Sequence, residues 1–99
     1  MNGHIRKVYV PMTETGFYIL LCHGYSIVQK VEALTHGEIR ISPGTMYGSL
    51  SKMEKDGLIR FVREENKRRI YCITELGTQV LELEMKRIER LYQTMMEVR

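Results

Sequence analysis

The spacing of apolar residues predicts a first helix that begins at Thr13. Glu14 falls in its first turn, where a negative charge suits the helix dipole. Residues 17–21 are densely apolar, so we expect this helix to be buried on most sides and to end at Gly24. Residues 1–12 carry no such pattern and are predicted to form an N-terminal arm.

A second helix is predicted to begin at Tyr25 or Ser26 and to stop at Gly37, a residue that readily closes a helix. Its apolar face would consist of Ile27, Val28, Val31 and Leu34. Residues 38–41 are too few for a further element and are expected to be an extended connector.

The next segment carries both a start and a stop signal for a third helix. Ser42 can cap it, and Pro43 suits the first helical position because its missing N–H would be unpaired there. Gly57 can supply the left-handed turn at the end, with Leu58 packing back on the last turn. The apolar face consists of Met46, Leu50 and Met53. The opposite face is small and hydroxylic where a surface helix usually carries charge.

Two short runs, residues 58–63 and 68–74, are rich in β-branched and aromatic residues and predict a β-hairpin. Residues 64–67 would connect them, with Asn66 able to adopt a positive φ. We expect an inward face of Ile59, Phe61, Ile70 and Cys72 and an outward face of Arg60, Arg63, Arg69 and Tyr71. The tip and one strand would therefore be basic.

A long last helix is predicted from Glu75 to about Glu97, with Thr74 as its cap. One apolar line consists of Leu76, Val80 and Leu83. A second, heptad-like line consists of Leu81, Met85, Ile88, Tyr92 and Met95, with Leu91 beside it. A helix of roughly 35 Å is too long to lay both lines against the rest of the chain. The second line is therefore expected to mediate self-association rather than to be intramolecular core.

The order helix, helix, helix, hairpin, long helix predicts a mainly α fold with a small β-hairpin. This is a winged helix-turn-helix domain over residues 13–74, followed by a C-terminal dimerisation helix over 75–99. In such domains the third helix enters the DNA major groove and the hairpin, or wing, touches the adjacent backbone. Small residues on the outer face of the third helix would let its axis approach the bases.

Charge distribution favours a polyanionic partner. The 99 residues carry a net charge of +3, but residues 40–69 hold eight Lys and Arg against four acidic residues. No apolar run approaches the ~20 residues that span a membrane, and no secretion signal is recognised, so we expect a cytoplasmic protein without a membrane partner. Cys22 and Cys72 are then expected to be reduced thiols rather than a disulfide or a redox sensor.

Catalysis is not predicted. The sequence has no phosphate-binding loop, no paired carboxylates in an apolar setting and no nucleophile beside a base. His4, His23 and His36 lack ligand spacing with one another or with cysteine, so neither a metal nor another cofactor is expected.

Several motifs together resemble the PadR family of bacterial transcriptional regulators. They are SPGTMY at 42–47, LSKMEKDGLI at 50–59, RRIY at 68–71 and ITELG at 73–77. Upstream, TGFYILL at 15–21 and HGYSI at 23–27 are similar to the family's first two helices, although family members generally have a longer connection before His23. The similarity covers roughly residues 10–90. The single helix after the wing resembles the small subfamily.

The resemblance implies a homodimeric, sequence-specific DNA-binding regulator. Such proteins are usually repressors, and a small aromatic or drug-like effector can relieve them. Carried over by position, DNA would be contacted by Thr45, Tyr47, Ser49 and Lys52 of the third helix and by Lys67, Arg68 and Arg69 of the wing. The helix start adds Ser42 and Gly44, because a helix N-terminus can face a phosphate. The dimer contact would consist of Leu81, Met85, Ile88, Leu91, Tyr92 and Met95. Two-fold symmetry then predicts a near-palindromic operator in double-stranded DNA.

Other interpretations of these residues stay open at this point. Tyr47 could belong to the core. Arg68 and Arg69 could form a solvated strand edge that prevents pairing with another strand. Adjacent strand residues point to opposite faces, so only one of the two arginines is expected to aim directly at DNA. The methionines of the last helix could fill an interface or line a ligand pocket between protomers. The alternative function is a winged-helix module for protein interaction or ligand sensing, without DNA binding.

Overall fold

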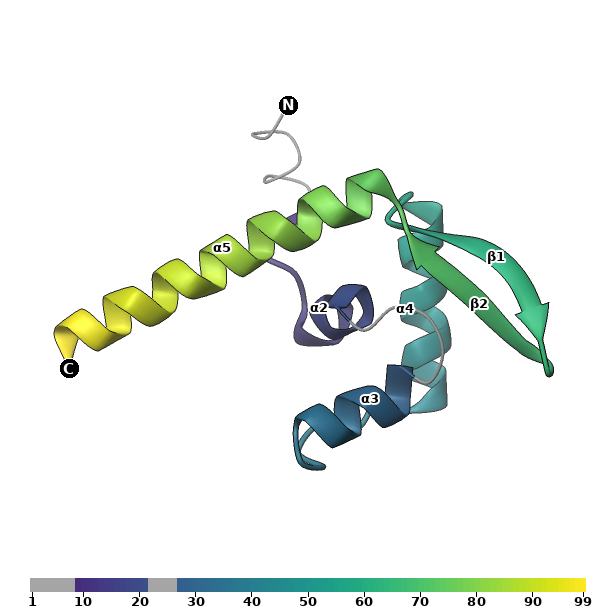
Figure 1. Cartoon of the computed structure of the whole chain (residues 1–99), viewed down its shortest axis with the longest axis horizontal. Coiled ribbons are helices and arrows are strands. Elements are labelled where there is room, and N and C mark those ends of the chain that lie inside the picture. Colours follow the sequence, from purple (N-terminus) through teal and green to yellow (C-terminus); the bar gives the residue numbers. More distant parts are fainter. Residues whose placement is uncertain (1–8, 22–26) are drawn as a thin grey trace.

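The computed structural model describes residues 9–21 and 27–99. Its elements are α2 (Glu14–Leu21), α3 (Ile27–Leu34), α4 (Pro43–Lys55), β1 (Ile59–Glu65), β2 (Arg68–Ile73) and α5 (Glu75–Val98). In Figure 1, α2 lies in the angle between α4 and α5, and the hairpin and the distal half of α5 project in opposite directions from this helical core. The fold is a winged helix-turn-helix domain with a long C-terminal helix, as the sequence predicts.

The first two helices supply the deepest part of the core. The first helix begins at Glu14, one residue later than predicted, and Thr13 caps it, because its Oγ1 accepts a hydrogen bond of 3.0 Å from the N–H of Gly16. Ile19 and Leu20 of α2 and Val31 of α3 are fully buried. The predicted end of the first helix at Gly24 and the start of the second at Tyr25 or Ser26 lie outside the described residues.

The prediction that Leu34 lies on the inner face of the second helix is wrong, since its side chain is 61% exposed. It is the last residue of α3. The chain turns away directly after it, and the N–H of Gly37 bonds back to the carbonyl of Glu32 at 2.7 Å. Leu34 therefore projects beyond the end of the core, although its spacing matches the buried residue Val31.

The predicted limits of the third helix are confirmed. Ser42 Oγ accepts a hydrogen bond of 3.2 Å from the N–H of Thr45, and Pro43 is the first residue of α4. At the other end Gly57 has φ 79°, and the N–H of Leu58 reaches the carbonyl of Met53 at 2.9 Å. The buried residues Met46 and Met53 form the inner face, and Leu50 packs against them partly exposed.

The hairpin has longer strands and a tighter turn than predicted. Asn66 and Lys67, with φ of 49° and 64°, form the whole turn, so Glu64 and Glu65 belong to β1. The pairing shifts by one residue between Phe61 and Arg63. The sequence places these strands correctly, but it does not reveal this bulge or the register that it sets.

The predicted faces of the hairpin are therefore partly wrong. Residues that pair across an antiparallel ladder share a face, and Ile59 pairs with Ile73 while Phe61 pairs with Tyr71. Tyr71 joins Ile59 in the core instead of facing outward. Phe61 is partly exposed instead of buried, and Cys72 is only half-buried.

The last helix is anchored at its start and at mid-length. Thr74 caps it as predicted, with its Oγ1 accepting a hydrogen bond of 3.0 Å from the N–H of Gly77. Val80 is fully buried in the core. Further along, the N–H of Met12 donates a 2.7 Å hydrogen bond to the carboxylate of Glu84, which ties the segment before α2 to α5. Beyond this contact α5 projects away from the other described elements (Figure 1).

Candidate nucleic-acid interface

The outer face of α4 is open and almost free of bulk. A Cβ built at Gly44 or at Gly48 would meet no atom within 4 Å, so nothing in the described part of the chain covers this face. Ser51 and Lys55 lie on the same face at helical spacing from Gly48, and both are exposed. Lys55 makes no ion pair with a described residue, and it was not among the DNA contacts expected from the sequence. Its seven-residue separation from Gly48 was the available signal.

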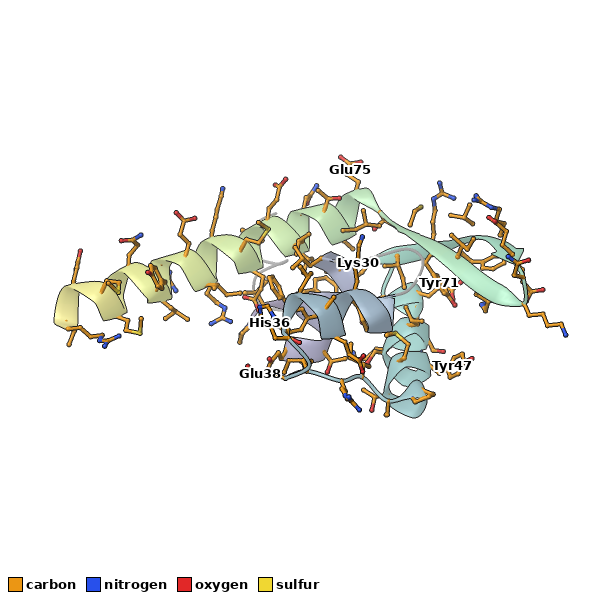
Figure 2. All side chains as sticks on the ribbon, turned by 60° about the horizontal axis from the view of Figure 1, so that its bottom comes forward. Lys30, His36, Glu38, Tyr47, Tyr71 and Glu75 are labelled. Carbon is orange, nitrogen blue, oxygen red and sulfur yellow. The ribbon has the colours of Figure 1, made fainter. Side chains whose placement is uncertain are left out.

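Tyr47 lies on the wing side of α4. Its side chain is 69% exposed, which makes the core interpretation wrong. Figure 2 shows it projecting from α4 toward the side on which the hairpin lies. A groove of about 380 Å³ separates α4 from the wing. Its lining consists of Pro43, Met46, Tyr47 and Leu50 from α4 and Glu64, Lys67, Arg69 and Tyr71 from the wing. The structure thus brings Tyr47 together with Lys67 and Arg69.

Ser49 and Lys52 lie on the other flank of α4. They line a second hollow, of about 320 Å³, together with residues of the segment before α2 and the start of that helix. Lys52 Nζ is 3.4 Å from the carboxylate of Asp56 in an exposed i,i+4 pair. Such pairs contribute only a few tenths of a kcal/mol, so this lysine can exchange its partner for another anion.

The hydroxyls at the start of α4 are already engaged with each other. Ser42 Oγ donates to Thr45 Oγ1 at 3.0 Å while it accepts from the Thr45 N–H. Both side chains are exposed. Their second role as DNA contacts stays a prediction, since capping uses only part of their hydrogen-bonding capacity.

The wing carries Lys67 at its tip and Arg69 near its middle. Lys67 is exposed and has no ion pair among the described residues. Arg69 Nε instead donates a 2.9 Å hydrogen bond to the hydroxyl of Tyr71, and its guanidinium lies 4.1 Å from the centre of the Phe61 ring. The hydrogen bond to Tyr71 raises the pKa of Arg69 against the opposing effect of desolvation, so the charge is permanent. The side chain of Arg68 lies outside the described part, and its role stays a prediction.

The predicted dimer contact is mostly exposed in the single chain. Four residues of the second apolar line, Met85, Ile88, Tyr92 and Met95, and Leu91 beside them are 41–54% exposed. Leu81 differs from them, because it is half-buried and packs against the core of its own chain.

Other chemistry is not indicated by the described residues. They contain no group of three or more His, Cys, Asp or Glu that could hold a metal ion. None of the helices among them combines the length and hydropathy needed to cross a membrane. Cys72 is a half-buried free thiol, and Cys22 lies outside the described residues, so the structure does not test the pair.

Comparison with known structures supports the winged-helix architecture. A transcriptional regulator from Clostridium thermocellum superimposes with a TM-score of 0.69, covering 83% of this chain and 86% of that chain at 24% identity. At this identity the match shows a shared fold.

Sequence comparison then identifies the family. The sequence model of the transcriptional regulator PadR-like family matches residues 21–83. The transcriptional regulator YqjI of Escherichia coli (strain K12) is 33% identical over 69 residues, which are 70% of this chain and 33% of that protein. The transcriptional regulator Rv3488 of Mycobacterium tuberculosis is 35% identical over 72 residues, which are 70% of this chain and 64% of that protein.

A further relative is an uncharacterised 37.1 kDa protein in transposon TN4556 of Streptomyces fradiae, 35% identical over 69 residues and matched over 19% of its length. The chain thus spans between 19% and 64% of these relatives. The family match covers more than half of the chain, and the chain belongs to the PadR-like family of transcriptional regulators. Proteins of this class are regulators and not enzymes, in agreement with the sequence analysis.

Proposed function

We propose that this protein is a homodimeric, sequence-specific DNA-binding regulator. In this proposal α4 enters the major groove of a near-palindromic operator, and the wing follows the adjacent sugar-phosphate backbone. The contacts on α4 would come from Gly44, Gly48, Ser49, Ser51, Lys52 and Lys55, with Ser42, Thr45 and Tyr47 around its start. Lys67 and Arg68 would contact the backbone from the wing. Because it acts on DNA, the protein would work in the cytoplasm.

The observation that carries the proposal is the position of Gly48. It lies in the interior of α4, where a glycine makes the helix less stable than an alanine would, by roughly 0.5–1 kcal/mol. Neither a positive φ nor a neighbouring atom requires it, since the space around a Cβ there is empty. Nothing within the chain requires a glycine that destabilises its helix in this way. A binding partner that approaches the helix backbone closely would require it, as the edges of base pairs do.

The wing tip supports the same interpretation. Lys67 holds a left-handed conformation, with φ of 64°, at the second position of a two-residue turn where glycine is strongly preferred. A lysine there is strained but presents a cation at the far end of the wing. Both departures from the locally best residue therefore fall on the proposed DNA-facing surface. Such departures are expected at functional sites.

The second apolar line of α5 supports a dimer. Its exposed residues continue from Met85 to Met96 along one side of the helix. An apolar patch of this extent is typical of an association surface, and a second copy of the same helix offers a matching one. Two-fold pairing would present two copies of α4 to half-sites about one DNA turn apart.

Repression is the proposed mode of action, because a protein that only occupies a promoter lowers transcription from it. A small aromatic or drug-like effector would relieve repression by favouring a relative orientation of the protomers that no longer fits the operator. The methionines within the dimer contact, Met85 and Met95, and the neighbouring Met96 would give that surface the adaptability such a ligand needs.

The deciding experiment is the substitution Gly48→Ala. It should raise the free energy of unfolding by about 0.5–1 kcal/mol and yet weaken DNA binding, because the added methyl group holds the helix away from the bases. Unfolding is measured by urea titration. Affinity is measured by fluorescence anisotropy on a duplex that the wild-type protein selects from a random-sequence pool.

The matched control is Ala33→Ser, which also adds one heavy atom to an exposed position, but on α3. It should leave DNA affinity unchanged. Equal affinity of Gly48→Ala and the wild type would place α4 outside the groove. Failure of the wild type to retain any duplex at 50 mM salt would reject DNA binding and favour the protein-interaction or ligand-sensing alternative.

A further inference from the structure

Arg69 connects three elements of the domain through one guanidinium group. Its Nε donates to the hydroxyl of Tyr71 on β2 at 2.9 Å, and its Cζ lies over the ring of Phe61 on β1, 4.1 Å from the ring centre. Its Nη2 atom is 3.9 Å from a carboxylate oxygen of Glu54 near the end of α4. The two aromatic rings themselves meet edge to face at 6.2 Å. A single side chain thus contacts both strands of the wing and the helix beside them.

The cluster is anchored in the core at one end only. Tyr71 is buried and packs against the main hydrophobic cluster, whereas Phe61 and Glu54 are partly exposed. The bulge at Val62 follows Phe61 directly, and pairing beyond it is shifted by one residue. Outward from this point the wing extends past α4 without a further helix beside it (Figure 1). Arg69 therefore sits where the supported base of the wing becomes its unsupported outer part.

We propose that Arg69 is a positioning residue that sets the angle of the wing against α4, through Tyr71 and Glu54, instead of acting chiefly as a phosphate contact. This inference rests on the proposed function, because the angle matters when α4 and the wing bind the same DNA. It revises the role that the family resemblance gives to Arg69. It also assigns a role to Glu54, an acidic residue near a surface proposed to meet a polyanion.

The chemistry of arginine suits this role and that of lysine does not. A planar guanidinium can stack on a ring, donate along its edge and pair with a carboxylate at the same time. An ammonium group keeps the charge but has no plane to stack. The groove of about 380 Å³ between α4 and the wing includes Arg69 and Tyr71 in its lining, so the angle that they fix also fixes the width of this groove. One DNA strand would pass through it, between Tyr47 and Lys67.

The substitution Glu54→Gln separates positioning from simple electrostatics. Removing a negative charge beside DNA should strengthen binding if charge alone matters. If the ion pair positions the wing, the same substitution should weaken binding by about two- to fivefold, the range that an exposed ion pair can supply. Arg69→Lys should weaken binding at least as much although the charge is kept, because it also removes the contacts with Tyr71 and Phe61. The salt dependence of its binding should stay unchanged because the charge is kept.

The matched control is Arg63→Lys, since Arg63 is an exposed wing arginine whose carboxylate partner, Glu65, belongs to the wing itself. It should bind like the wild type. Arg69→Lys combined with Glu54→Gln should bind no more weakly than Arg69→Lys alone, because Arg69→Lys already disturbs the pair that Glu54→Gln removes. Tighter binding by Glu54→Gln, or wild-type binding by Arg69→Lys, would overturn the inference.

A measurement without DNA keeps this inference separate from the proposed function. Backbone ¹⁵N relaxation of residues 63–68 should show larger motions in Arg69→Lys and Glu54→Gln than in the wild type and in Arg63→Lys. Unchanged relaxation in both variants would overturn the positioning role even if the protein binds DNA. Increased motion in a protein that binds no duplex would reject the proposed function and leave the mechanical role of Arg69 intact.

Discussion

At the scale of single residues, Gly77 has the strictest steric requirement among the described glycines. A Cβ at this position would lie 2.1 Å from the carbonyl oxygen of Leu58 and 2.8 Å from Cγ1 of Ile73. The same carbonyl accepts a hydrogen bond of 3.0 Å from the N–H of Thr74. It cannot move without losing this bond, which holds the start of α5 to the residue before β1. Gly77 therefore lets the last helix touch the backbone that joins α4 to β1.

Gly77→Ala should lower the free energy of unfolding by about 3 kcal/mol, since a rigid backbone must shift to admit the methyl group. Gly48→Ala makes the same chemical change in open space and should have the opposite sign. Urea unfolding of both variants measures the difference. If Gly77→Ala were as stable as the wild type, α5 would not press on Leu58 as the structure has it.

Glu84 is the one charged residue that is buried among those described, and its burial was not expected from the sequence. Its carboxylate is 1% exposed and accepts bonds from the Met12 N–H and from the guanidinium of Arg87. Burial alone would raise its pKa, but the hydrogen bonds from Arg87 and Met12 outweigh burial and hold the pKa below its usual value. The i,i+3 spacing to Arg87 was visible in the sequence, whereas the distant contact with Met12 was not.

A lowered pKa means that the ionised form of Glu84 stabilises the folded state. This stabilisation is complete above the ordinary glutamate pKa of about 4.3 and is lost as the pH falls through the lower value of the folded protein. Glu84→Gln should therefore cost about 1.5–3 kcal/mol at neutral pH. The difference in free energy of unfolding between this variant and the wild type should shrink as the solution becomes acidic.

Urea unfolding between pH 7 and pH 3 measures this effect, with the exposed Glu82→Gln as the control on the same helix. The control should follow the wild type at every pH. A deficit of Glu84→Gln that stays constant down to pH 3 would show that the ionised carboxylate is not what stabilises the contact.

At the scale of elements, the limits of the helices were predictable because their signals are local. Ser42, Pro43 and Gly57 act within four residues of themselves, and the structure uses each of them as predicted. The faces of the hairpin were not predictable in the same way. They depend on the register, which is set by a two-residue turn and by a bulge at Val62 that no local residue preference indicates.

The same contrast applies to the candidate site. The open face of α4 follows from helical periodicity once Met46 and Met53 are assigned to the core, and the exposed positions agree with it. The role inferred for Arg69 depends on how closely the hairpin approaches Glu54. That distance comes from tertiary packing, and the sequence pattern offered only a basic residue on a strand.

The turn of the wing allows a test at the same scale. Lys67→Gly should stabilise the fold by about 1 kcal/mol, because glycine adopts the left-handed conformation without strain. It should also weaken DNA binding. The slope of log binding constant against log salt concentration should become shallower by about 0.9 per half-site, because each protomer loses one phosphate contact.

Lys67→Ala is the matched comparison for this test. It removes the same charge but keeps the strain, so it should lose affinity to the same extent without gaining stability. Anisotropy titrations over a range of salt concentrations and urea unfolding separate the two effects. A Lys67→Gly protein that is more stable and binds DNA like the wild type would remove the wing tip from the proposed interface.

At the scale of the whole molecule, the function proposed here needs two chains. One α4 would cover only a half-site, and linking two half-sites through a dimer would raise the affinity far above that of either alone. The exposed side of α5, centred on Ile88, is the surface that would link them. Across a two-fold axis Ile88 would meet apolar residues of the second copy, where a carboxylate could be neither hydrated nor paired.

Ile88→Glu should therefore yield a monomer of 11.7 kDa by light scattering, where the wild type should give twice this mass. Its binding to the selected duplex should fall with it, and the salt slope should drop to about half, since only one set of phosphate contacts remains. Gln93→Glu adds the same carboxylate to the polar side of α5 and should stay dimeric. If Ile88→Glu remained a dimer with full affinity, the chains would associate through another surface, and the exposed apolar side of α5 would need a different partner.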